Sequence, residues 1–528
     1  MSGADLDVDV AVVGGGAVGM LLTAELARLG VRTAVLEREP HTVDLPKAGT
    51  LHGRTVQPLV RRGYLARRPA GPPGRTVDIP FHFAGLTALR IAAPAVEGPP
   101  IAGVPQAELE RFFEKVAREH GAAVLRGRTV TGLEQAPDGV EVAARSGGRA
   151  VRVTARYAVG ADGARGPVLR LAGITAAEEP PSTASLLGLV RLLDPGSAPA
   201  GWNPTPRGWT MINVSATGHS RVVTIDHSGP PRDHRAPLEP AELQETVSHI
   251  AGYDVPMADP RHLGRFSDYA RLADRYRQGR VFLAGDAAHL HAPLGGQGLN
   301  LGLQDAIGLG WRLALAVRGR AGKGLLDGYH DERHPAARRV LGNVRAQTAL
   351  MRPGPDGDAL RALFTELLGL EEVNDLLGGM VSAQETAYPA VLGGSPWEGR
   401  FLPDLPLSAP GGRAASVSGL LAEGRPALLL TGADDGGCAE AAASWDAVRT
   451  VRAAVPSGPP APALLLRPDG YIAWAGPADP EELRSALRHW FGDPAQPRAA
   501  GPGPAGARRP SGASSTGALS TSRGSDPR

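Results

Sequence analysis

The stretch that decides the fold is VDVAVVGGGAVGMLLTAELARLGVRTAVLE, residues Val8–Glu37. Its first six residues alternate and then become continuously apolar, which predicts a buried strand. The turn GGGAVG follows at residues 14–19, and the spacing of residues 20–29 predicts a helix that ends at Gly30. A second strand is expected at residues 33–36 and finishes at Glu37. This order of strand, glycine-rich turn, helix and strand is typical of a Rossmann-like dinucleotide-binding unit.

Each conspicuous residue of this unit has a mechanical role. Gly14 allows the tight turn, Gly16 lets a pyrophosphate approach the backbone, and Gly19 lets helix and strand pack closely. Glu37 stands about 20 residues further on, where a carboxylate can accept both ribose hydroxyls of an adenosine. Its charge argues against the 2′-phosphate of NADP in this site. The sequence therefore predicts an adenine-dinucleotide site here, against the alternative of an ordinary glycine-rich turn.

A second informative stretch is RVFLAGDAAHLHAPLGGQGLNLGLQDAIGLGW, residues Arg280–Trp311. A short apolar strand at residues 281–284 leads into Gly285-Asp286, and helical spacing begins at Leu299. Between them lies a polar turn that contains Pro293, Gly295, Gly296, Gln297 and Gly298. A carboxylate, bare backbone N–H groups and a helix N-terminus can bind sugar-type hydroxyls and a group that is or becomes anionic. From this chemistry alone, a plain strand–loop–helix turn remains the alternative.

A second acid–glycine turn, Asp162-Gly163, follows another expected strand. With these two acid–glycine turns and the GGGAVG turn, the chain resembles the group A flavoprotein monooxygenases, which have the para-hydroxybenzoate hydroxylase fold. Within that family it is most similar to the aromatic polyketide hydroxylases of actinobacterial antibiotic pathways. The motifs are GGGAVG, the DG turn, GDAAHLHAPLGGQGLNLGLQDA from Gly285, and two from the polyketide branch, YHDERHP at Tyr329–Pro335 and RPDGYIAW at Arg467–Trp474. The resemblance spans residues 8–492.

The resemblance implies roles for individual residues. Glu37 would bind the adenosine ribose, Gln106 and Asp286 the ribityl region of FAD, and residues 295–298 the pyrimidine edge of the flavin. Asp162 lies in the motif tied to both FAD and the nicotinamide cofactor. The catalytic residues are unknown, with the flavin-edge loop as the candidate; it comprises Pro293, Gly295, Gly296 and Gln297.

Other candidate residues are open to two interpretations. Lys47 and Arg54 are placed to reach phosphates or a flavin edge, or are solvated cations. Gln106 stands at a helix start, where an amide is often only a cap. The chain departs from the family at Lys47, where Arg is common, and at Gly166, where Ser is common after the DG turn. His227 and His234 are expected to be surface residues, because no metal-ligand spacing accompanies them.

The fold class expected is α/β: a Rossmann-like FAD-binding domain with an inserted mixed-sheet substrate domain and a C-terminal thioredoxin-like domain. The FAD-binding domain would comprise residues 1–174 and 280–392, the second part carrying long helices from residue 299 to 349. The substrate sheet would occupy residues 175–279 and the thioredoxin-like domain residues 393–492. That domain lacks any CxxC, which excludes disulfide exchange. Residues 493–528 have the composition of a disordered tail.

The function implied is that of an FAD-dependent monooxygenase. NAD(P)H, bound only transiently, reduces FAD; O₂ adds to the flavin C4a, and the hydroperoxide hydroxylates a polycyclic aromatic substrate of the polyketide type. One alternative is Baeyer–Villiger insertion on a polyketide. Another is a catalytically idle flavin-binding partner protein. Halogenation is disfavoured because no Trp-x-Trp-x-Ile-Pro motif is present.

Composition excludes several other classes. Among 528 residues, 42% are hydrophobic, no apolar run is long enough to span a bilayer, and the net charge is +2, which argues against nucleic acid and anionic membranes. The single Cys438 excludes an intramolecular disulfide and a cysteine-cluster metal site, and no metal is expected. The beginning of the sequence lacks a secretory pattern, so a cytoplasmic location is expected. A homodimer is a possible assembly.

Overall fold

The computed structural model describes residues 6–45, 48–68, 71–72, 74–229, 236–408, 414–432, 434–456 and 458–494. Lys47, His234 and residues 495–528 of the expected disordered tail lie outside these ranges. The interpretations given above for these residues therefore stay predictions.

The central sheet is built around β1 (Leu6–Val13), which lies between β10 (Arg149–Gly160) and β2 (Thr33–Glu37) and is parallel to both. β19 (Val281–Leu283) pairs in parallel with β10, and β7 (Ala123–Arg126) with β2. Because the strands are parallel, their carboxyl ends meet at one edge of the sheet. The three glycine-containing turns that follow β1, β10 and β19 therefore come together, which confirms the Rossmann-like fold.

Three further strands complete this sheet. β8 (Thr129–Gln135) and β9 (Val140–Ser146) form a hairpin that pairs with β10, and the short β18 (Arg277–Gln278) lies antiparallel to β19. The α4 turn (Val168–Leu171) follows the DG motif.

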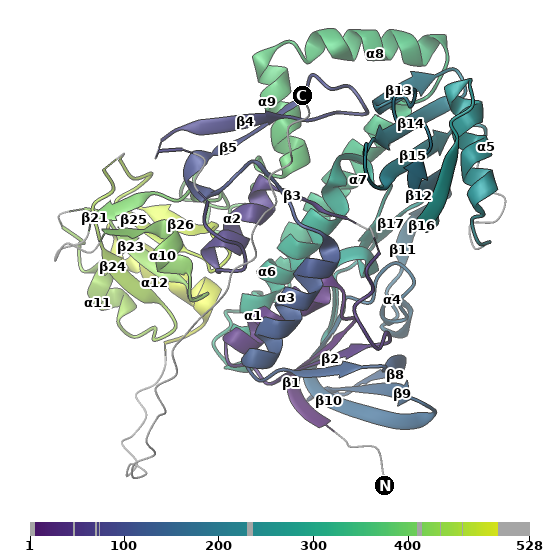
Figure 1. Cartoon of the computed structure of the whole chain (residues 1–528). Helices are drawn as coiled ribbons and strands as arrows, with labels where there is room; N and C mark the ends of the chain where they lie inside the picture. Colours follow the sequence, from purple (N-terminus) through teal and green to yellow (C-terminus); the bar gives the residue numbers. More distant parts are fainter. Residues whose placement is uncertain are drawn as a thin grey trace.

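Three helices cover this sheet (Figure 1): α1 (Ala17–Arg28), α3 (Gln106–Glu119) and α6 (Gln297–Val317). α6 is buried along almost its whole length and is the central helix of the molecule. Gly302 makes a close approach to α1 possible, since a Cβ there would lie 2.7 Å from Val18 Cγ2.

The long helices expected from residue 299 to 349 are present, with a break between them. The structure has two helices, α6 and α7 (Gly328–Leu350), joined by the non-helical residues 318–327. Gly319 and Gly324 in this connection adopt positive φ angles of 68° and 90°, which end a right-handed helix.

A five-stranded antiparallel sheet forms a separate layer, coloured teal in Figure 1. Its order is β13 (Gly201–Thr205), β14 (Gly208–Asn213), β15 (Ser220–Asp226), β12 (Ala184–Leu192) and β16 (Met257–Ser267). Helix α5 (Pro240–Ala251) packs its buried Leu243 and Val247 against one face. The opposite face is turned toward the rest of the molecule.

A three-stranded sheet connects this layer to the turn after β19. It contains β11 (Ala176–Glu179), β17 (Ala270–Ala273) and β20 (His289–Leu290). The pairing of β17 with β20 joins the end of the sheet layer directly to the segment after Asp286.

The remaining elements border these layers. They are β3 (Thr50–His52) paired with β6 (Ile101–Gly103), α2 (Gly53–Arg61), β4 (Thr76–Pro80) paired with β5 (Arg90–Pro94), the 3-10 turns η1 (Ala95–Glu97), η2 (Gly285–Ala287) and η3 (Leu294–Gly296), α8 (Pro355–Leu367) and α9 (Glu371–Ser382). None of the helices in the described ranges is long and apolar enough to cross a membrane.

The C-terminal part has a sheet of its own, with the strand order β24 (Arg449–Arg452), β23 (Ala427–Leu430), β25 (Ala463–Leu466) and β26 (Ile472–Gly476). Around it lie α10 (Val417–Leu421), α11 (Cys438–Ala442), α12 (Pro480–Phe491) and the pair β21 (Pro406–Ser408) and β22 (Ala414–Ser416). Trp490 of α12 packs 6.4 Å from Trp311 of α6, measured between ring centroids. This part is therefore docked on the central helix.

Candidate active site

The three glycines of the first turn, Gly14, Gly16 and Gly19, are needed for different reasons. Gly14 has φ = 105°, and a Cβ on it would lie 2.2 Å from Ala161 O; a Cβ on Gly19 would lie 1.9 Å from Gly14 O. A Cβ on Gly16 would meet nothing closer than Glu110 Oε1 at 3.9 Å. Packing within the protein thus requires Gly14 and Gly19. Gly16, the N-cap of α1 with no side-chain cap, leaves open space at a helix N-terminus, where a phosphate fits.

Glu37 lies at the end of β2, beside this turn, and is partly exposed. Its Oε2 accepts a 2.5 Å hydrogen bond from the Gly15 backbone N–H, and its Oε1 accepts one of 2.8 Å from the Glu39 N–H. The carboxylate therefore orders the turn as well as presenting oxygens beside it.

Gln106 is the first residue of α3, and its Nε2 donates to Glu110 Oε1 at 2.7 Å. Because Glu110 is the nearest group to the open space at Gly16, the structure brings Gln106 into the neighbourhood of the first turn. The amide is held within its own helix.

Asp162 and Gly163 follow β10. One Asp162 oxygen, Oδ2, accepts a 2.9 Å hydrogen bond from the Val168 N–H, while Oδ1 is buried with no hydrogen-bond partner among the described residues. Burial raises the pKa of Asp162 to about 6. A Cβ on Gly166 would lie 1.9 Å from Asp162 Cγ, so the Asp162 side chain fills the space that a serine side chain would need. This contact explains the glycine at position 166.

Gly285 opens the turn after β19 with φ = 63°, and its N–H donates to Asp305 Oδ2 at 3.0 Å. The same carboxylate accepts 2.7 Å hydrogen bonds from His289 Nε2 and Arg333 Nε, and all three side chains are fully buried. Burial opposes ionisation of Asp305, but the charges of Arg333 and His289 keep its pKa below the usual range. This network fixes the turn to α6 and α7. Asp286 itself is exposed at the surface of the turn.

In the flavin-edge loop, Gly295 and Gly296 have φ angles of 67° and 64°, which other residues adopt only with strain. His52 Nε2 donates to Gly295 O at 2.8 Å, and burial lowers the pKa of His52 to about 4, so the ring is neutral near pH 7. Asn300 Nδ2 donates a hydrogen bond to Gly296 O at 2.8 Å.

Helix α6 then begins at Gln297, and its N-cap, Gly296, provides no side-chain cap. The first amides of the helix are thus available for an anionic group. Gln297 is buried, Gly298 lies beside His291, and Pro293 is exposed.

Arg54 is not brought to these turns. Its guanidinium donates to Gln384 O at 2.7 Å and to Gln57 Oε1 at 2.8 Å, and it lies 3.9 Å from the ring centroid of Phe401. It is directed toward the chain that enters the C-terminal part.

Sequence reasoning missed four residues whose hydrogen bonds fix the turn after β19 and the flavin-edge loop: Asp305, Arg333, His52 and Asn300. Asp305 stands in the GD motif and Arg333 in YHDERHP, so their motifs were the available signal. His227, expected at the surface, is partly exposed, and its Nε2 is buried.

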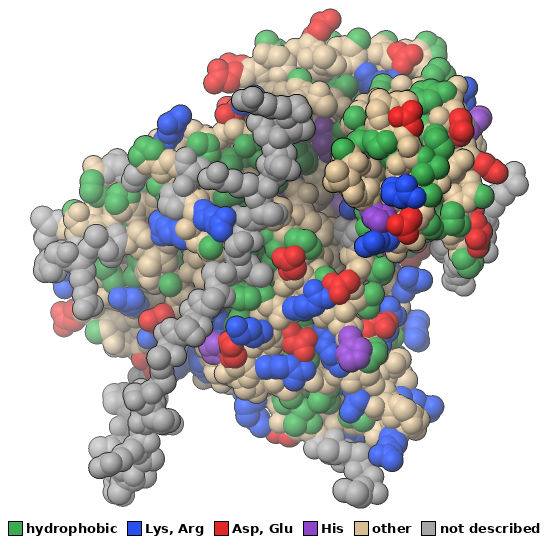
Figure 2. Space-filling view, viewed as in Figure 1, with side chains coloured by type: hydrophobic (Ala, Val, Ile, Leu, Met, Phe, Trp, Pro, Cys, Tyr) green, Lys and Arg blue, Asp and Glu red, His purple; other side chains and the backbone are tan. Residues whose placement is uncertain are grey.

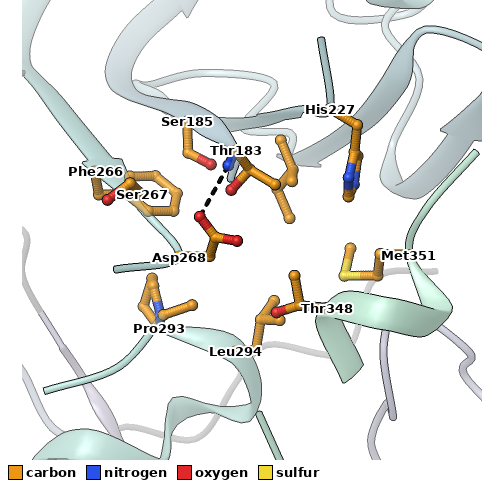
Figure 3. Close-up of a pocket in the computed structure, with 12 residues that line it drawn as sticks. Thr183, Ser185, His227, Phe266, Ser267, Asp268, Pro293, Leu294, Thr348 and Met351 are labelled. Atoms are coloured by element: carbon orange, nitrogen blue, oxygen red, sulfur yellow. Dashed lines mark hydrogen bonds between the residues drawn. The ribbon is translucent and has the colours of Figure 1, made fainter. Parts of the chain in front are cut away.

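A pocket that opens to solvent lies between the five-stranded sheet and the flavin-edge loop, with about 290 Å³ of empty space when the open solvent at its mouth is included (Figure 3). The sheet contributes Ser185, Ile225 and Phe266, the loop contributes Pro293 and Leu294, and α7 contributes Thr348. The pocket therefore combines apolar walls with a few polar groups, next to the flavin-edge loop and the N-terminus of α6. Outside the pocket, charges of both signs are interspersed over the molecular face shown in Figure 2.

The open space at Gly16, the unpartnered Asp162 Oδ1 and the uncapped α6 N-terminus fit an extended, phosphate-containing cofactor with a polar ring. The family model for the FAD-binding domain matches residues 7–344, and that for the aromatic-ring hydroxylase C-terminal domain matches residues 395–494. The chain belongs to the FAD-binding aromatic-ring hydroxylases. It is an FAD-dependent, NAD(P)H-consuming monooxygenase whose small-molecule aromatic substrate reacts with O₂.

Three known proteins show the breadth of this family. The chain is 39% identical to a rifampicin monooxygenase of Streptomyces venezuelae, over 92% of this chain and 98% of the relative. It is 36% identical to the structure of the OxyS anhydrotetracycline hydroxylase from Streptomyces rimosus, with a TM-score of 0.82 over 93% of this chain and all of that one. It is 37% identical to the Diels-Alderase PyrE3 of the pyrroindomycin pathway, with a TM-score of 0.78 over 92% of this chain and all of that one.

Proposed function

We propose that this monooxygenase hydroxylates a polycyclic aromatic substrate of the polyketide antibiotic type. The observation that carries the proposal is the pocket between the sheet and the flavin-edge loop. Its walls are mainly apolar, through Ile225, Phe266, Leu294 and Met351, and flat fused rings bury well in such a space. Two relatives named above act on rifampicin and on anhydrotetracycline, as their names state.

The roles proposed for the cofactor residues are supported by the meeting of the three turns at one edge of the sheet. Gly14, Gly16 and Gly19 form the pyrophosphate turn, Glu37 accepts from the adenosine ribose, and Gln106 and Asp286 serve the ribityl chain. Asp162 and Gly163, in the DG turn, would also contact this cofactor. Bound FAD supplies the redox chemistry with NAD(P)H and O₂.

The chain's own contribution near the ring would be electrostatic. The amides at the start of α6, beside Gly295 and Gly296, would stabilise negative charge on the pyrimidine edge, because the positive end of the helix dipole lies there. Gln297 and Gly298 begin this helix, and Pro293 lies at the pocket wall. The loop thus separates the cofactor side from the substrate side.

Turnover under ¹⁸O₂ tests the function. One labelled oxygen should enter the product for each NAD(P)H consumed productively, and a phenolic position of the label means hydroxylation. Label in an ester would instead mean Baeyer–Villiger insertion. The similarity to a Diels-Alderase makes the control important: product formed without NAD(P)H or label would show a non-oxidative role.

The proposal also covers the domain division, the oligomeric state and the cellular location. We propose that residues 1–174 and 280–392 bind FAD, residues 175–279 the substrate, and residues 393–492 form a thioredoxin-like domain. A homodimer is supported by exposed leucines on α8 and α9 (Leu360, Leu363, Leu376), and sedimentation velocity tests it. A cytoplasmic location is supported by the need for NAD(P)H, and fractionation of cells tests it.

A further inference from the structure

The pocket wall formed by the five-stranded sheet has a regular pattern. Ser185 of β12 pairs with Ile225 of β15, and both line the pocket. Leu186, the next residue, packs on the opposite face with the α5 cluster. Alternation along a strand therefore directs every second residue into the pocket. His227, two residues after Ile225, continues this row.

His227 has a ring nitrogen with no partner at this wall. Its Nε2 is buried and makes no hydrogen bond with any described residue. Figure 3 shows the imidazole at one end of the pocket, beside Met351. A buried, unpaired polar atom costs free energy unless a ligand satisfies it.

Two other polar groups of the pocket, Asp268 and Thr348, are engaged with the protein. Asp268 Oδ1 accepts from the Ser182 and Thr183 N–H groups at 2.7 and 2.9 Å, and Oδ2 accepts from Ser182 Oγ at 2.5 Å. Thr348 Oγ1 donates to Val344 O at 3.0 Å. These groups hold the wall together, and His227 Nε2 is the nitrogen left for a ligand.

Charged groups of both signs surround His227. Arg352 and Arg361 act on it from the segment around α8, Asp226 from the end of β15 and Asp268 from the turn after β16. Burial, assisted by Arg352, lowers the pKa of His227. The imidazole is therefore neutral near pH 7 and can accept a proton at Nε2.

We propose that His227 Nε2 accepts the hydrogen bond of a phenolic hydroxyl of the substrate and takes its proton as the ring is oxidised. The inference rests on the proposed function and names the residue that orients the substrate. The O–H bond breaks, its electron pair stays on the oxygen, and an N–H bond forms on the imidazole. The phenolate raises electron density in the ring, which makes the ring a better nucleophile toward electrophilic oxygen.

Binding to the FAD-loaded protein tests this without turnover. The probes are two fused-ring compounds, 2-hydroxyanthraquinone and 2-methoxyanthraquinone. In the second, a methyl group replaces the hydroxyl hydrogen, so it cannot donate a hydrogen bond. The readout is quenching of protein fluorescence. The unmodified protein should bind the hydroxyl probe about tenfold more tightly, as expected for one hydrogen bond at a buried acceptor. His227→Leu should bind the two probes equally, and His227→Gln, whose amide oxygen can accept, should recover part of the preference.

His249→Leu is the matched control, because His249 is exposed on α5, which covers the other face of the sheet. It should keep the tenfold preference. The preference of the unmodified protein should also fall at acidic pH, where the imidazole becomes charged, but not change with pH in His227→Leu.

A preference that survives in His227→Leu, or is absent in the unmodified protein, would overturn the assignment. If neither probe binds the unmodified protein, the pocket does not take a fused-ring phenol, and the assignment fails as well. Failure of ¹⁸O₂ incorporation with the probe preference intact would instead sink only the proposed function.

Discussion

Arg467 and Glu332 form a bidentate ion pair across 135 positions of the chain. Nη1 lies 2.6 Å from Oε1 and Nη2 lies 2.8 Å from Oε2, with both side chains buried. Glu332 also pairs with Arg312 of α6 at 2.7 Å, and Arg467 with Asp469. The motifs YHDERHP and RPDGYIAW thus meet in one buried cluster that docks the C-terminal part onto the central helix.

Replacing Arg467 by Met should lower the free energy of unfolding by about 3–5 kcal/mol, because Glu332 and Asp469 stay buried with part of their compensation lost. Urea denaturation of the FAD-loaded protein measures this. Arg484→Met removes an exposed pair with Glu481 and should cost at most about 1 kcal/mol. Equal losses of unfolding free energy in the two variants would show that the buried cluster stabilises the protein no more than an exposed ion pair does.

The glycines of the first turn allow a matched comparison. Gly19→Ala should destabilise the fold, because its Cβ would lie 1.9 Å from Gly14 O. Gly16→Ala has no such clash within the protein and should fold normally, but the added methyl group occupies the space proposed for the pyrophosphate. Thermal melting and FAD titration of both variants separate the two effects. Tight FAD binding by Gly16→Ala would refute the placement of the pyrophosphate.

Glu37→Ala should weaken FAD binding about 10- to 100-fold, since a charge-assisted hydrogen bond contributes roughly 1.5–3 kcal/mol. Part of this loss would come from the turn, because Glu37 also holds the Gly15 N–H. Glu37→Gln, whose amide oxygen can still accept that bond, should lose less. Equilibrium titration with FAD measures both, and unchanged affinity in the alanine variant would contradict the ribose role.

Asp162 should make stability depend on pH in the FAD-free protein. Its pKa is raised from 3.8 to about 6, so the folded state binds the proton more tightly than the unfolded state. Its contribution is therefore fully present below pH 3.8 and is lost as the pH rises through 6. Relative to Asp162→Asn, the protein should lose about 2 kcal/mol between pH 4 and 7.

Urea titrations of the two proteins at each pH supply this difference, in which other titrating groups cancel. A difference that stays constant, or that grows more favourable with rising pH, would mean that burial does not control this carboxylate.

Local patterns were enough for much of the fold. The strand at residues 8–13, the turn at residues 14–19 and the acid at Glu37 were predictable because their spacing reflects backbone geometry within one βαβ unit. The parallel pairing of β1, β2, β10 and β19 agrees with the Rossmann-like fold expected from them, since such units have few possible arrangements. The glycine-rich start of α6 was readable for the same local reason.

The sequence by itself determined the order of the nucleotide-binding elements and the family, because these depend on residues close together in the chain. Only the tertiary structure decided the partners of buried polar groups. Asp305 meets Arg333 across 28 positions, Arg54 is turned toward Gln384 across 330, and His227 joins Pro293 and Met351 at one pocket. These contacts depend on how helices and sheets pack, and no local spacing encodes which charges become neighbours.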